Sequence, residues 1–217
     1  MYVPSHFAET DDRRIAQFVD RHPLATVVVV SDGRLEAHHL PVVRQGPLAV
    51  GARLIAHVAR GNPLWRLAES RVAALLVFSG AAAYVSPSYY PGKNEHGRVV
   101  PTFNYAAVHV HGELACSHDE AARRNAVERL TAHLEATRHP PWSLADAPED
   151  YVAAMLRGIV ALSFEVRAFE VKFKASQNKS VADRRGVVQG LRQDFAATEA
   201  AEAAAMIEEG LDATRPP

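Results

Sequence analysis

A run of β-branched residues that ends in a tight turn constrains the fold of this chain more than any other feature. Residues 24–30 are followed at once by Ser31-Asp32-Gly33, in which glycine can adopt the positive φ that a hairpin turn requires. We therefore expect a β-hairpin whose second strand extends from about residue 34 to residue 43. Hairpins join antiparallel strands, whereas parallel strands need a long crossover connection, so the sheet is expected to begin as an antiparallel one.

The remaining patterns follow the same hairpin-like order. Further strands are expected at residues 53–58, 72–78, 83–86, 99–116 and 159–173. Helices are expected at residues 11–21, from 63 onward, and at 117–136, 148–158 and 184–210. Because helices stand between some strands rather than after each one, we predict a mainly β, α+β fold, an antiparallel barrel with peripheral helices. Residues 1–180 should form the barrel domain, and residues 181–217 a helical extension packed on it.

The 217-residue chain is almost electrically neutral, with 24 Lys and Arg against 25 Asp and Glu and a net charge of −1. This balance lacks the basic excess of proteins that coat nucleic acids, although it allows a local basic patch. Cys116 is the single cysteine, so neither a disulfide within the chain nor a CxxC zinc site is expected. The apolar runs are too short to span a membrane and no signal peptide is readable, which predicts a soluble, cytoplasmic protein.

The segment His57-Val58-Ala59-Arg60-Gly61-Asn62-Pro63 carries a signal for anion binding. A strand is expected to run into a helix here, with Asn62 as the cap and Pro63 at the first helical position. Backbone N–H groups at a helix start favour anions, and the Arg60 guanidinium adds a forked donor set, so the segment predicts a phosphate site. A capped helix with a solvent-exposed Arg60 explains the same residues equally well.

Two further segments combine aromatic, hydroxyl, amide and cationic side chains. Residues 84–91 and 100–105 suit a flat ligand that needs stacking area and a few hydrogen bonds, although a rigid Pro-rich loop is the alternative. Residues 172–179 place Lys172 and Lys174 on one face of a strand and continue with hydroxyl and amide side chains. This pattern predicts contact with a phosphate or a polar heterocycle edge, unless the lysines protect a solvated edge strand.

The histidines and the absence of known catalytic motifs limit the kinds of functional site that we expect in this chain. His38 and His39 are adjacent on a strand and point to opposite faces, so only one of them can line an interior site. His109 and His111 share a face, but no nearby carboxylate pattern completes a metal site and we expect no metal. No Rossmann, Walker, GxSxG or HExxH motif occurs. A protein that holds a reactive cofactor is therefore favoured over an enzyme that uses its own acid, base or nucleophile.

Short blocks spread over nearly the whole chain carry a family resemblance: MYVPSHF (1–7), HLP (39–41), HVARGNPLW (57–65), FSG (78–80), AYVSPSYY (83–90), VVPTFNY (99–105), VH (108–109), KASQNK (174–179) and DRRGVVQGL (183–191). In this order they resemble the PaiB-type family of FMN-binding negative transcriptional regulators, part of the FMN-binding split-barrel group. The chain departs from the family pattern at Ala81 and Ala82, where Pro and His are usual. It also departs at Tyr89 and Phe103, where Trp is commoner, and at Ala175, where Leu is commoner.

The resemblance implies a six-stranded split barrel that dimerises, with two symmetric FMN sites between the subunits. It assigns the FMN phosphate, which is nearly dianionic at neutral pH, to His57, Arg60 and Asn62. His39 is a further cofactor-binding candidate. The candidates for the ribityl chain or the isoalloxazine ring are Thr102, Asn104, Lys174, Ser176, Gln177 and Asn178.

These inferences lead to a homodimeric, FMN-binding regulatory protein of the PaiB type that represses transcription. Because no helix-turn-helix with a basic recognition helix is visible, we expect it to act through the flavin state or a protein partner, without a dedicated DNA-reading motif. The alternatives are a flavin-dependent oxidoreductase acting on a small substrate, a haem-binding split-barrel protein, and a scaffold that has lost its ligand.

Overall fold

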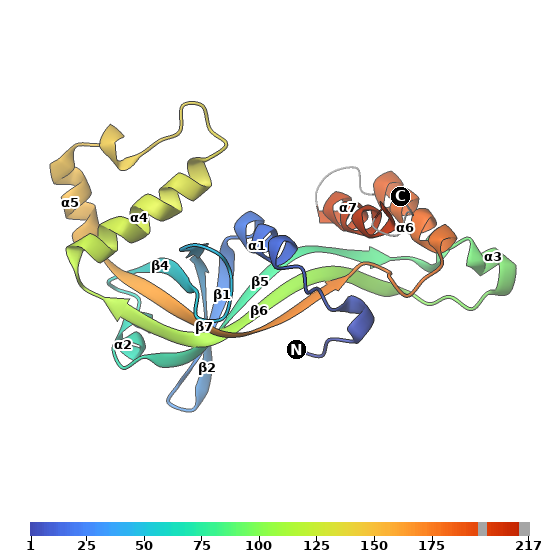
Figure 1. Ribbon diagram of the computed structural model, residues 1–217, viewed down its shortest axis with the longest axis horizontal. Helices are drawn as coiled ribbons and strands as arrows, with labels where there is room; N and C mark the ends of the chain where they lie inside the picture. The colour runs from blue at the N-terminus through green and yellow to red at the C-terminus, as the bar shows by residue number, and fades with distance from the viewer. Residues whose placement is uncertain (195–198, 213–217) are drawn as a thin grey trace. The chain divides into compact units, whose positions relative to one another are not determined.

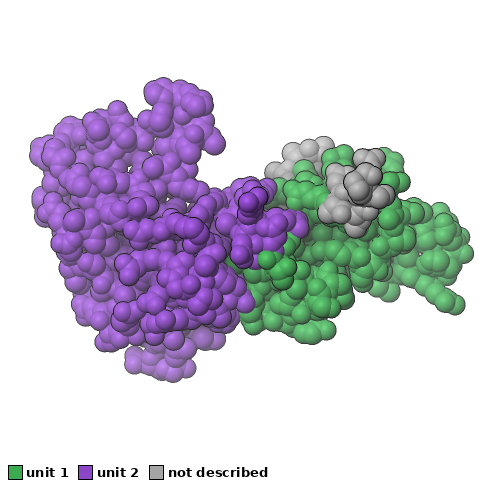
Figure 2. All heavy atoms as spheres, in the orientation of Figure 1, with its two compact units in different colours: residues 1–10, 79–108, 170–217 green, residues 11–78, 109–169 purple. Residues whose placement is uncertain are grey.

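The computed structural model describes residues 1–194 and 199–212 and divides into two compact units, each of which is described by itself. Unit 2 comprises Asp11–Phe78 and His109–Phe169, and unit 1 comprises Met1–Thr10, Ser79–Val108 and Glu170–Pro217 (Figure 2). Within the predicted C-terminal extension, residues 195–198 and 213–217 lie outside the described residues. The predicted domain boundary at residue 180 stays a prediction.

The sheet contains the strands β1 (Leu24–Ser31), β2 (Arg34–Pro41), β3 (Val43–Arg44), β4 (Arg53–Ala59), β5 (Val72–Val85), β6 (Thr102–Ser117) and β7 (Ile159–Lys174). Their order in the sheet is β2-β1-β5-β6-β7-β4-β3 (Figure 1). β1 pairs antiparallel with β2 and β5, and β4 pairs antiparallel with β3 and β7. The predicted mainly β, antiparallel architecture with peripheral helices is confirmed, but the sheet of the described residues has β2 and β3 at its two ends and is not closed into a barrel.

The chain changes its pairing partner within the second half of the predicted hairpin. β2 pairs with β1 as far as Pro41, and the Val42 N–H then donates to the Pro23 carbonyl at 2.8 Å. Directly afterwards β3 begins and pairs with β4. The single strand predicted for residues 34–43 is therefore divided at Val42, and the two outermost strands of the sheet are consecutive in the chain. The short β3 also adds a seventh strand to the six that the resemblance implies.

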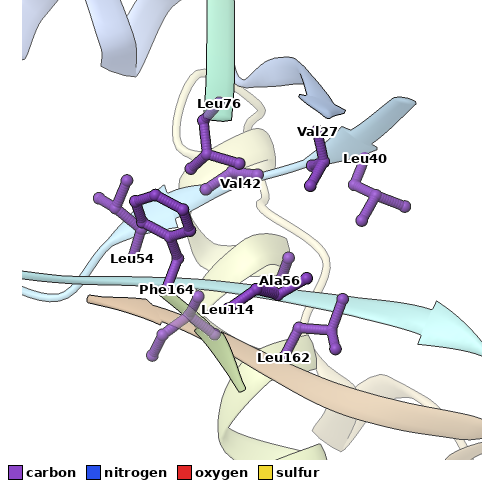
Figure 3. A pocket seen from close by; sticks show the side chains of 10 residues that line it. Val27, Leu40, Val42, Leu54, Ala56, Leu76, Leu114, Leu162 and Phe164 are labelled. Atoms are coloured by element: carbon purple, nitrogen blue, oxygen red, sulfur yellow. The ribbon is translucent and has the colours of Figure 1, made fainter. Parts of the chain in front are cut away.

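The inner face of unit 2 is apolar and encloses a small cavity (Figure 3). Six strands and the β2–β3 connection contribute the residues that line it, which are Val27, Leu40, Val42, Leu54, Ile55, Ala56, Leu76, Leu114, Leu162 and Phe164. Not one of these side chains carries a hydrogen-bonding group, and a phosphate buried among them would lose its hydration without compensation. The interior is therefore a packed core, and a charged ligand has to bind elsewhere.

The helices of unit 2 are α1 (Asp12–Arg21), α2 (Leu64–Ala68), α4 (Glu120–Glu135) and α5 (Glu149–Arg157). α1 begins after Asp11, whose carboxylate accepts hydrogen bonds from the Arg13 and Arg14 N–H groups. α4 buries Ala126 and Leu130 in one cluster with residues of β3, β4 and β7. None of the helices in residues 1–194 and 199–212 is long and apolar enough to cross a membrane.

Unit 1 contains α3 (Gly92–His96), α6 (Val181–Asp194) and α7 (Glu199–Asp212). α6 and α7 pack on each other (Figure 1), and their core includes Val187, Leu191, Ile207 and the ring of Tyr90. The N-terminal segment runs beside the end of β7, where Ala8 forms an isolated antiparallel bridge. The apolar contacts of α6 and α7 thus hold the loop that follows β5.

Three local expectations are wrong. β5 is one strand of 14 residues rather than two pieces, because Gly80 takes up no positive φ and the backbone stays extended through Ser79-Gly80. α3 lies in a segment expected to be a loop. The described residues of the tail expected to be helical over 184–210 are helical, in α6 and α7, but the end expected at Gly210 is wrong because α7 continues to Asp212.

Two glycines on α6 allow the loop after β5 to dock on this helix. A Cβ at Gly186 would lie 2.2 Å from the Tyr89 carbonyl oxygen, and one at Gly190 would lie 2.2 Å from the Tyr89 ring. The two residues are four positions apart and therefore share one face of the helix. Their lack of side chains lets Tyr89 and Pro91 approach the helix backbone.

Replacing Gly186 or Gly190 by alanine is expected to lower the free energy of unfolding. Alanine favours a helix over glycine by about 1 kcal/mol, but the clash with Tyr89 should cost about 1–3 kcal/mol or more and reverse the sign. Urea denaturation measures the difference, and Gln189→Ala, at an exposed position of the same helix, should change stability by less than about 0.5 kcal/mol. A Gly190→Ala protein as stable as the wild type would contradict this packing.

Candidate functional site

The chain leaves β4 through a junction in which main-chain carbonyl groups hold Arg60. The Arg60 N–H donates to the Gly158 carbonyl at 2.8 Å. Its side chain donates from Nε to the Arg157 carbonyl at 3.0 Å and from Nη2 to the Ile159 carbonyl at 3.4 Å. These acceptors lie where the end of α5 meets the start of β7, and all of them are neutral.

The positive charge of Arg60 remains uncompensated by these contacts. The side chain is exposed, and no carboxylate in the described part of the chain pairs with it. Because two main-chain carbonyls fix the plane of the guanidinium, its remaining N–H groups are oriented before any ligand arrives. This arrangement suits an anion better than the alternative of a loose surface arginine.

Asn62 and Trp65 complete the junction, but not with the helix cap that the sequence predicts. The Asn62 side-chain oxygen accepts the Leu64 N–H at 2.9 Å, and α2 begins at Leu64, with Pro63 in the capping position. α2 has only five residues, so its dipole offers an anion little. Trp65 donates from Nε1 to the Arg60 carbonyl at 2.9 Å. The group of the junction that is best suited to an anion is therefore the arginine rather than a helix start.

His57 lies on β4 opposite Ala161 and is half-buried. Burial lowers the pKa of its imidazole below the ordinary 6.5, so the ring is neutral at pH 7. Its Nδ1 is buried and has no hydrogen-bond partner among the described residues. A neutral imidazole offers a ligand one donor and one acceptor, but no charge. A buried polar atom without a partner is the kind of group that a ligand satisfies.

The other histidines make separate contacts. The exposed His39 places its Nδ1 3.1 Å from the Thr26 hydroxyl across the β1–β2 pair, so its hydrogen bond joins it to β1 rather than to Arg60. His109 and His111 lie on β6. Within the two described stretches of chain, no three His, Cys, Asp or Glu side chains gather as a metal site would require.

In unit 1 four of the predicted site residues form two hydrogen-bonded pairs. The Lys174 ammonium donates to the Thr102 hydroxyl, and Asn104 Nδ2 donates to Ser176 Oγ at 2.9 Å. Asn104 is fully buried, and its Oδ1 has no partner among the described residues. Ser176 adopts a φ of 59° just after β7. These pairs link the beginning of β6 to the end of β7.

Gln177 and Asn178 differ from these four residues. The Gln177 Oε1 accepts the Ala175 N–H at 2.7 Å, and its Nε2 donates to the Phe173 carbonyl. Both ends of this amide bind backbone, which stabilises the turn after β7, and a ligand would have to replace these bonds. Asn178 is exposed. A role for either residue in cofactor binding stays a prediction.

The aromatic side chains expected to form one ligand wall have different surroundings in unit 1. Tyr90 is buried, and the Tyr89 hydroxyl donates to Asp194. Burial, reinforced by Asp194, raises the pKa of Tyr89 to about 12. Tyr84 and Phe103 are exposed and meet edge to face, with 5.8 Å between ring centroids. The rings that offer stacking area at the surface are those of this pair.

The cysteine offers no activated nucleophile. Cys116 is half-buried, and burial raises the pKa of its thiol, with the charge of Glu69 adding to the effect. A thiol with a raised pKa is less reactive at neutral pH.

Sequence reasoning does not find the carbonyl groups that hold Arg60, because they lie 97 and 99 residues away in the chain. The grouping of lysines around Lys174 does have a sequence signal. The chain contains 20 arginines but only four lysines, and three of these are Lys172, Lys174 and Lys179. A residue type so rare elsewhere points to a local requirement.

The sequence matches the family model described as "Putative FMN-binding domain" over residues 1–168. It is 32% identical over 203 residues to "Protease synthase and sporulation protein PAI 2" of Bacillus subtilis, and the alignment covers 89% of this chain and 90% of that protein. A protein of Aspergillus fumigatus is 28% identical over 239 residues, which cover 89% of this chain and 91% of the fungal protein.

Two solved structures share the fold. The FAD and heme binding protein from Mycobacterium smegmatis has a TM-score of 0.58 and 19% identity, with 82% of this chain and 78% of that chain covered. The flavocytochrome Anf3 from Azotobacter vinelandii also has a TM-score of 0.58, with 16% identity and coverage of 80% and 72%. At these identities the likeness concerns the split-barrel fold alone.

Removing the His57 imidazole is expected to make the stability of the protein less sensitive to acid. The ring is neutral in the folded chain and binds a proton more readily after unfolding. Its stabilisation is therefore complete above the unfolded pKa of about 6.5 and is lost as the pH falls below it. Unfolding free energies in urea at about pH 7.5 and about pH 5.5 should differ less in His57→Asn than in the wild type. Equal differences would show that His57 is not a buried neutral group.

Proposed function

Because the chain belongs to the PaiB-type family of FMN-binding split-barrel proteins, we propose that it is a homodimeric flavoprotein that regulates transcription negatively. The observation that carries the proposed flavin site is the Arg60 guanidinium, which is exposed and held by two main-chain carbonyls. A cation whose orientation is fixed in advance loses little conformational entropy when it binds a phosphate. The junction after β4 is therefore the proposed anchor of FMN.

The residues of this junction fit the phosphate end of FMN. Arg60 supplies the positive charge, the neutral His57 can donate a hydrogen bond, and the Asn62 amide retains its N–H donors. A phosphate dianion beside His57 would favour the imidazolium form and raise the pKa of this residue. When bound, FMN supplies the redox chemistry through its isoalloxazine ring, and the chain supplies binding and orientation.

The other cofactor-binding candidates remain part of the proposal without a contact that assigns their role. His39 is proposed to lie near the cofactor on the strength of the family resemblance. The residues proposed for the ribityl chain or the ring system are Thr102, Asn104, Lys174, Ser176, Gln177 and Asn178.

A regulator of this kind does not need to read DNA with its C-terminal helices. The α7 sequence contains five acidic and no basic residues, which would repel the DNA backbone. On α6, Arg184 is buried and donates to the Ile207 carbonyl at 3.1 Å, while Arg192 pairs with Glu208 at 2.7 Å. These observations support regulation through the flavin state or a protein partner. The name of the Bacillus subtilis relative, which refers to protease synthesis and sporulation, is compatible with such a role.

Exposed aromatic side chains support the proposed dimer. Tyr84 and Phe103 are 46% and 56% exposed although they contact each other, and Val100 is 64% exposed. Apolar side chains grouped at a surface are typical of protein interfaces. A second copy of the chain is the partner that the family resemblance implies for them.

Replacing Arg60 by methionine is expected to weaken FMN binding much more than riboflavin binding. A hydrogen bond between a guanidinium and a phosphate contributes about 1.5–3 kcal/mol, so the dissociation constant for FMN should rise about 10-fold to 100-fold. Riboflavin has no phosphate, and its affinity should change little. Quenching of flavin fluorescence measures both constants.

Arg66→Met is the matched control for this experiment. Arg66 is an exposed arginine of the same junction whose guanidinium lies 5.2 Å from the centroid of the Trp65 ring. Its loss removes the same charge and leaves the Arg60 contacts in place, so FMN affinity should stay near the wild-type value. Equal losses of FMN and riboflavin affinity in Arg60→Met would overturn the assignment of the phosphate to Arg60.

The purified dimer is expected to give no sequence-specific shift of DNA in an electrophoretic mobility assay. α7 is acidic, and Arg184 and Arg192 of α6 are engaged, so Arg185 is left as a single exposed arginine on α6, which does not make a basic face. The assay compares a duplex from upstream of the chain's own gene with an unrelated duplex, at low and moderate salt. A salt-sensitive shift specific to the first duplex would refute regulation without direct DNA reading.

A further inference from the structure

Unit 1 gathers three of the four lysines of the chain into one region, here called the lysine cluster. Lys172 and Lys174 are two positions apart at the end of β7. Lys179 follows after a turn in which its N–H donates to the Ser176 carbonyl at 2.9 Å. The fourth lysine, Lys93, lies on α3. Because arginine is the usual cation elsewhere in the chain, lysine here indicates a need for compact, mobile charges.

The lysine cluster is not a solvated surface. Lys172 is only 8% exposed, and Lys174 and Lys179 are half-buried. Burial lowers the pKa of Lys174, and the charges of Lys172 and Lys179 lower it further, so the ammonium groups repel one another. No carboxylate within residues 1–194 and 199–212 forms an ion pair with any of the three. The grouped positive charges therefore lower the stability of the folded chain, because no carboxylate of the described residues neutralises them.

The immediate neighbours of the ammonium groups are neutral. The Lys172 Nζ donates to the Tyr2 carbonyl at 3.2 Å, and the Lys174 Nζ donates to the Thr102 hydroxyl. Each ammonium group has three N–H donors, so Lys172 and Lys174 keep N–H donors that a ligand can use. The Nζ atom of Lys172 lies 5.2 Å from the centroid of the Tyr105 ring. The corresponding distances are 5.9 Å from Lys174 to the Phe7 ring and 5.4 Å from Lys179 to the Tyr90 ring. Cation–π contacts stabilise the charges without cancelling them.

We propose that the lysine cluster binds a phosphomonoester. Such a group carries a charge of about −1.5 to −2 at pH 7 and several acceptor oxygens, which match a group of three ammonium charges better than a single carboxylate does. Partial burial strengthens the attraction relative to water. The recessed Lys172 suits a small ligand better than the backbone of duplex DNA. Under the proposed function the FMN phosphate is assigned to Arg60, so the lysine cluster is expected to take the phosphate of a second ligand. If the cluster takes the FMN phosphate instead, the assignment to Arg60 is wrong.

Reductive labelling of the flavin-free protein tests the site without any variant that could fail to fold. Pyridoxal 5′-phosphate carries a phosphomonoester and an aldehyde, and the aldehyde condenses with a lysine amine with loss of water. Borohydride then reduces the imine to a stable secondary amine that peptide mass spectrometry locates. Labelling of Lys174 relative to Lys93 should be about 10-fold higher with pyridoxal 5′-phosphate than with pyridoxal, which lacks the phosphate. This comparison separates phosphate recognition from the intrinsic reactivity of Lys174.

Competition identifies the source of the phosphate. Inorganic phosphate should suppress the labelling of Lys174 more than sodium chloride of equal ionic strength does, and Lys179→Met should reduce this protection, whereas Lys93→Met should not. If FMN protects Lys174 and riboflavin does not, the cluster holds the flavin phosphate and the assignment of that phosphate to Arg60 is wrong. If inorganic phosphate still protects Lys174 in the FMN-loaded protein, the cluster holds a second ligand.

Three results would overturn the proposal. The first is a labelling of Lys174 relative to Lys93 that is the same with pyridoxal 5′-phosphate and with pyridoxal. The second is equal suppression of Lys174 labelling by sodium chloride and inorganic phosphate. The third is protection of Lys174 from labelling by duplex DNA and by none of the phosphate compounds. Because the labelling needs no bound flavin, a failure of FMN to bind in the fluorescence titration would leave this test intact.

Discussion

The apolar interior of unit 2 decides where polar chemistry can take place in this protein. Strands from both ends of the sheet direct aliphatic side chains and Phe164 into one core that offers no hydrogen bond to a ligand. A phosphorylated ligand must therefore be held outside this core, where the backbone turns away from the sheet. Both cationic groups described above meet this requirement: Arg60 follows β4, and Lys174 ends β7.

The two cationic groups differ because the arginine guanidinium and the lysine ammonium group bind a ligand in different ways. The planar fork of Arg60 is held by two main-chain carbonyls, so it presents a fixed direction to a ligand. The ammonium groups of Lys172 and Lys174 have one hydrogen-bond acceptor each and lie among aromatic rings. These ammonium groups concentrate positive charge but do not fix the direction of a hydrogen bond to a ligand. The first arrangement orients a bound phosphate, and the second supplies grouped positive charge to a small phosphomonoester.

Much of the fold could be predicted from the sequence because its signals are local. The Ser31-Asp32-Gly33 turn correctly predicts the first hairpin, and the helical spacing of apolar residues within 11–21 correctly predicts α1. The division of the second strand at Val42 could not be predicted, because it depends on pairing with β4. Gly80 was misleading for a similar reason: glycine permits a turn but does not require one, and the sheet keeps it extended.

The candidate site could be predicted in part. The position of Arg60 beside Asn62 correctly predicts a basic junction, but the carbonyl groups that orient it come from a distant connection. The pattern of residues 174–178 correctly predicts a polar strand end, whereas nothing in it reveals that the Gln177 amide binds backbone. Residue types identify candidate donors, and the tertiary fold decides which of them remain available to a ligand.

Gel filtration with absorbance and light-scattering detection most directly tests the central claim, which is that the protein is a dimer that binds FMN. Protein incubated with FMN and separated from unbound flavin should elute as a dimer, with flavin absorption under the protein peak and equal amounts of FMN and chain. A colourless protein peak, together with flavin fluorescence that stays unquenched at every ratio of protein to FMN, would contradict the claim that this split barrel binds FMN.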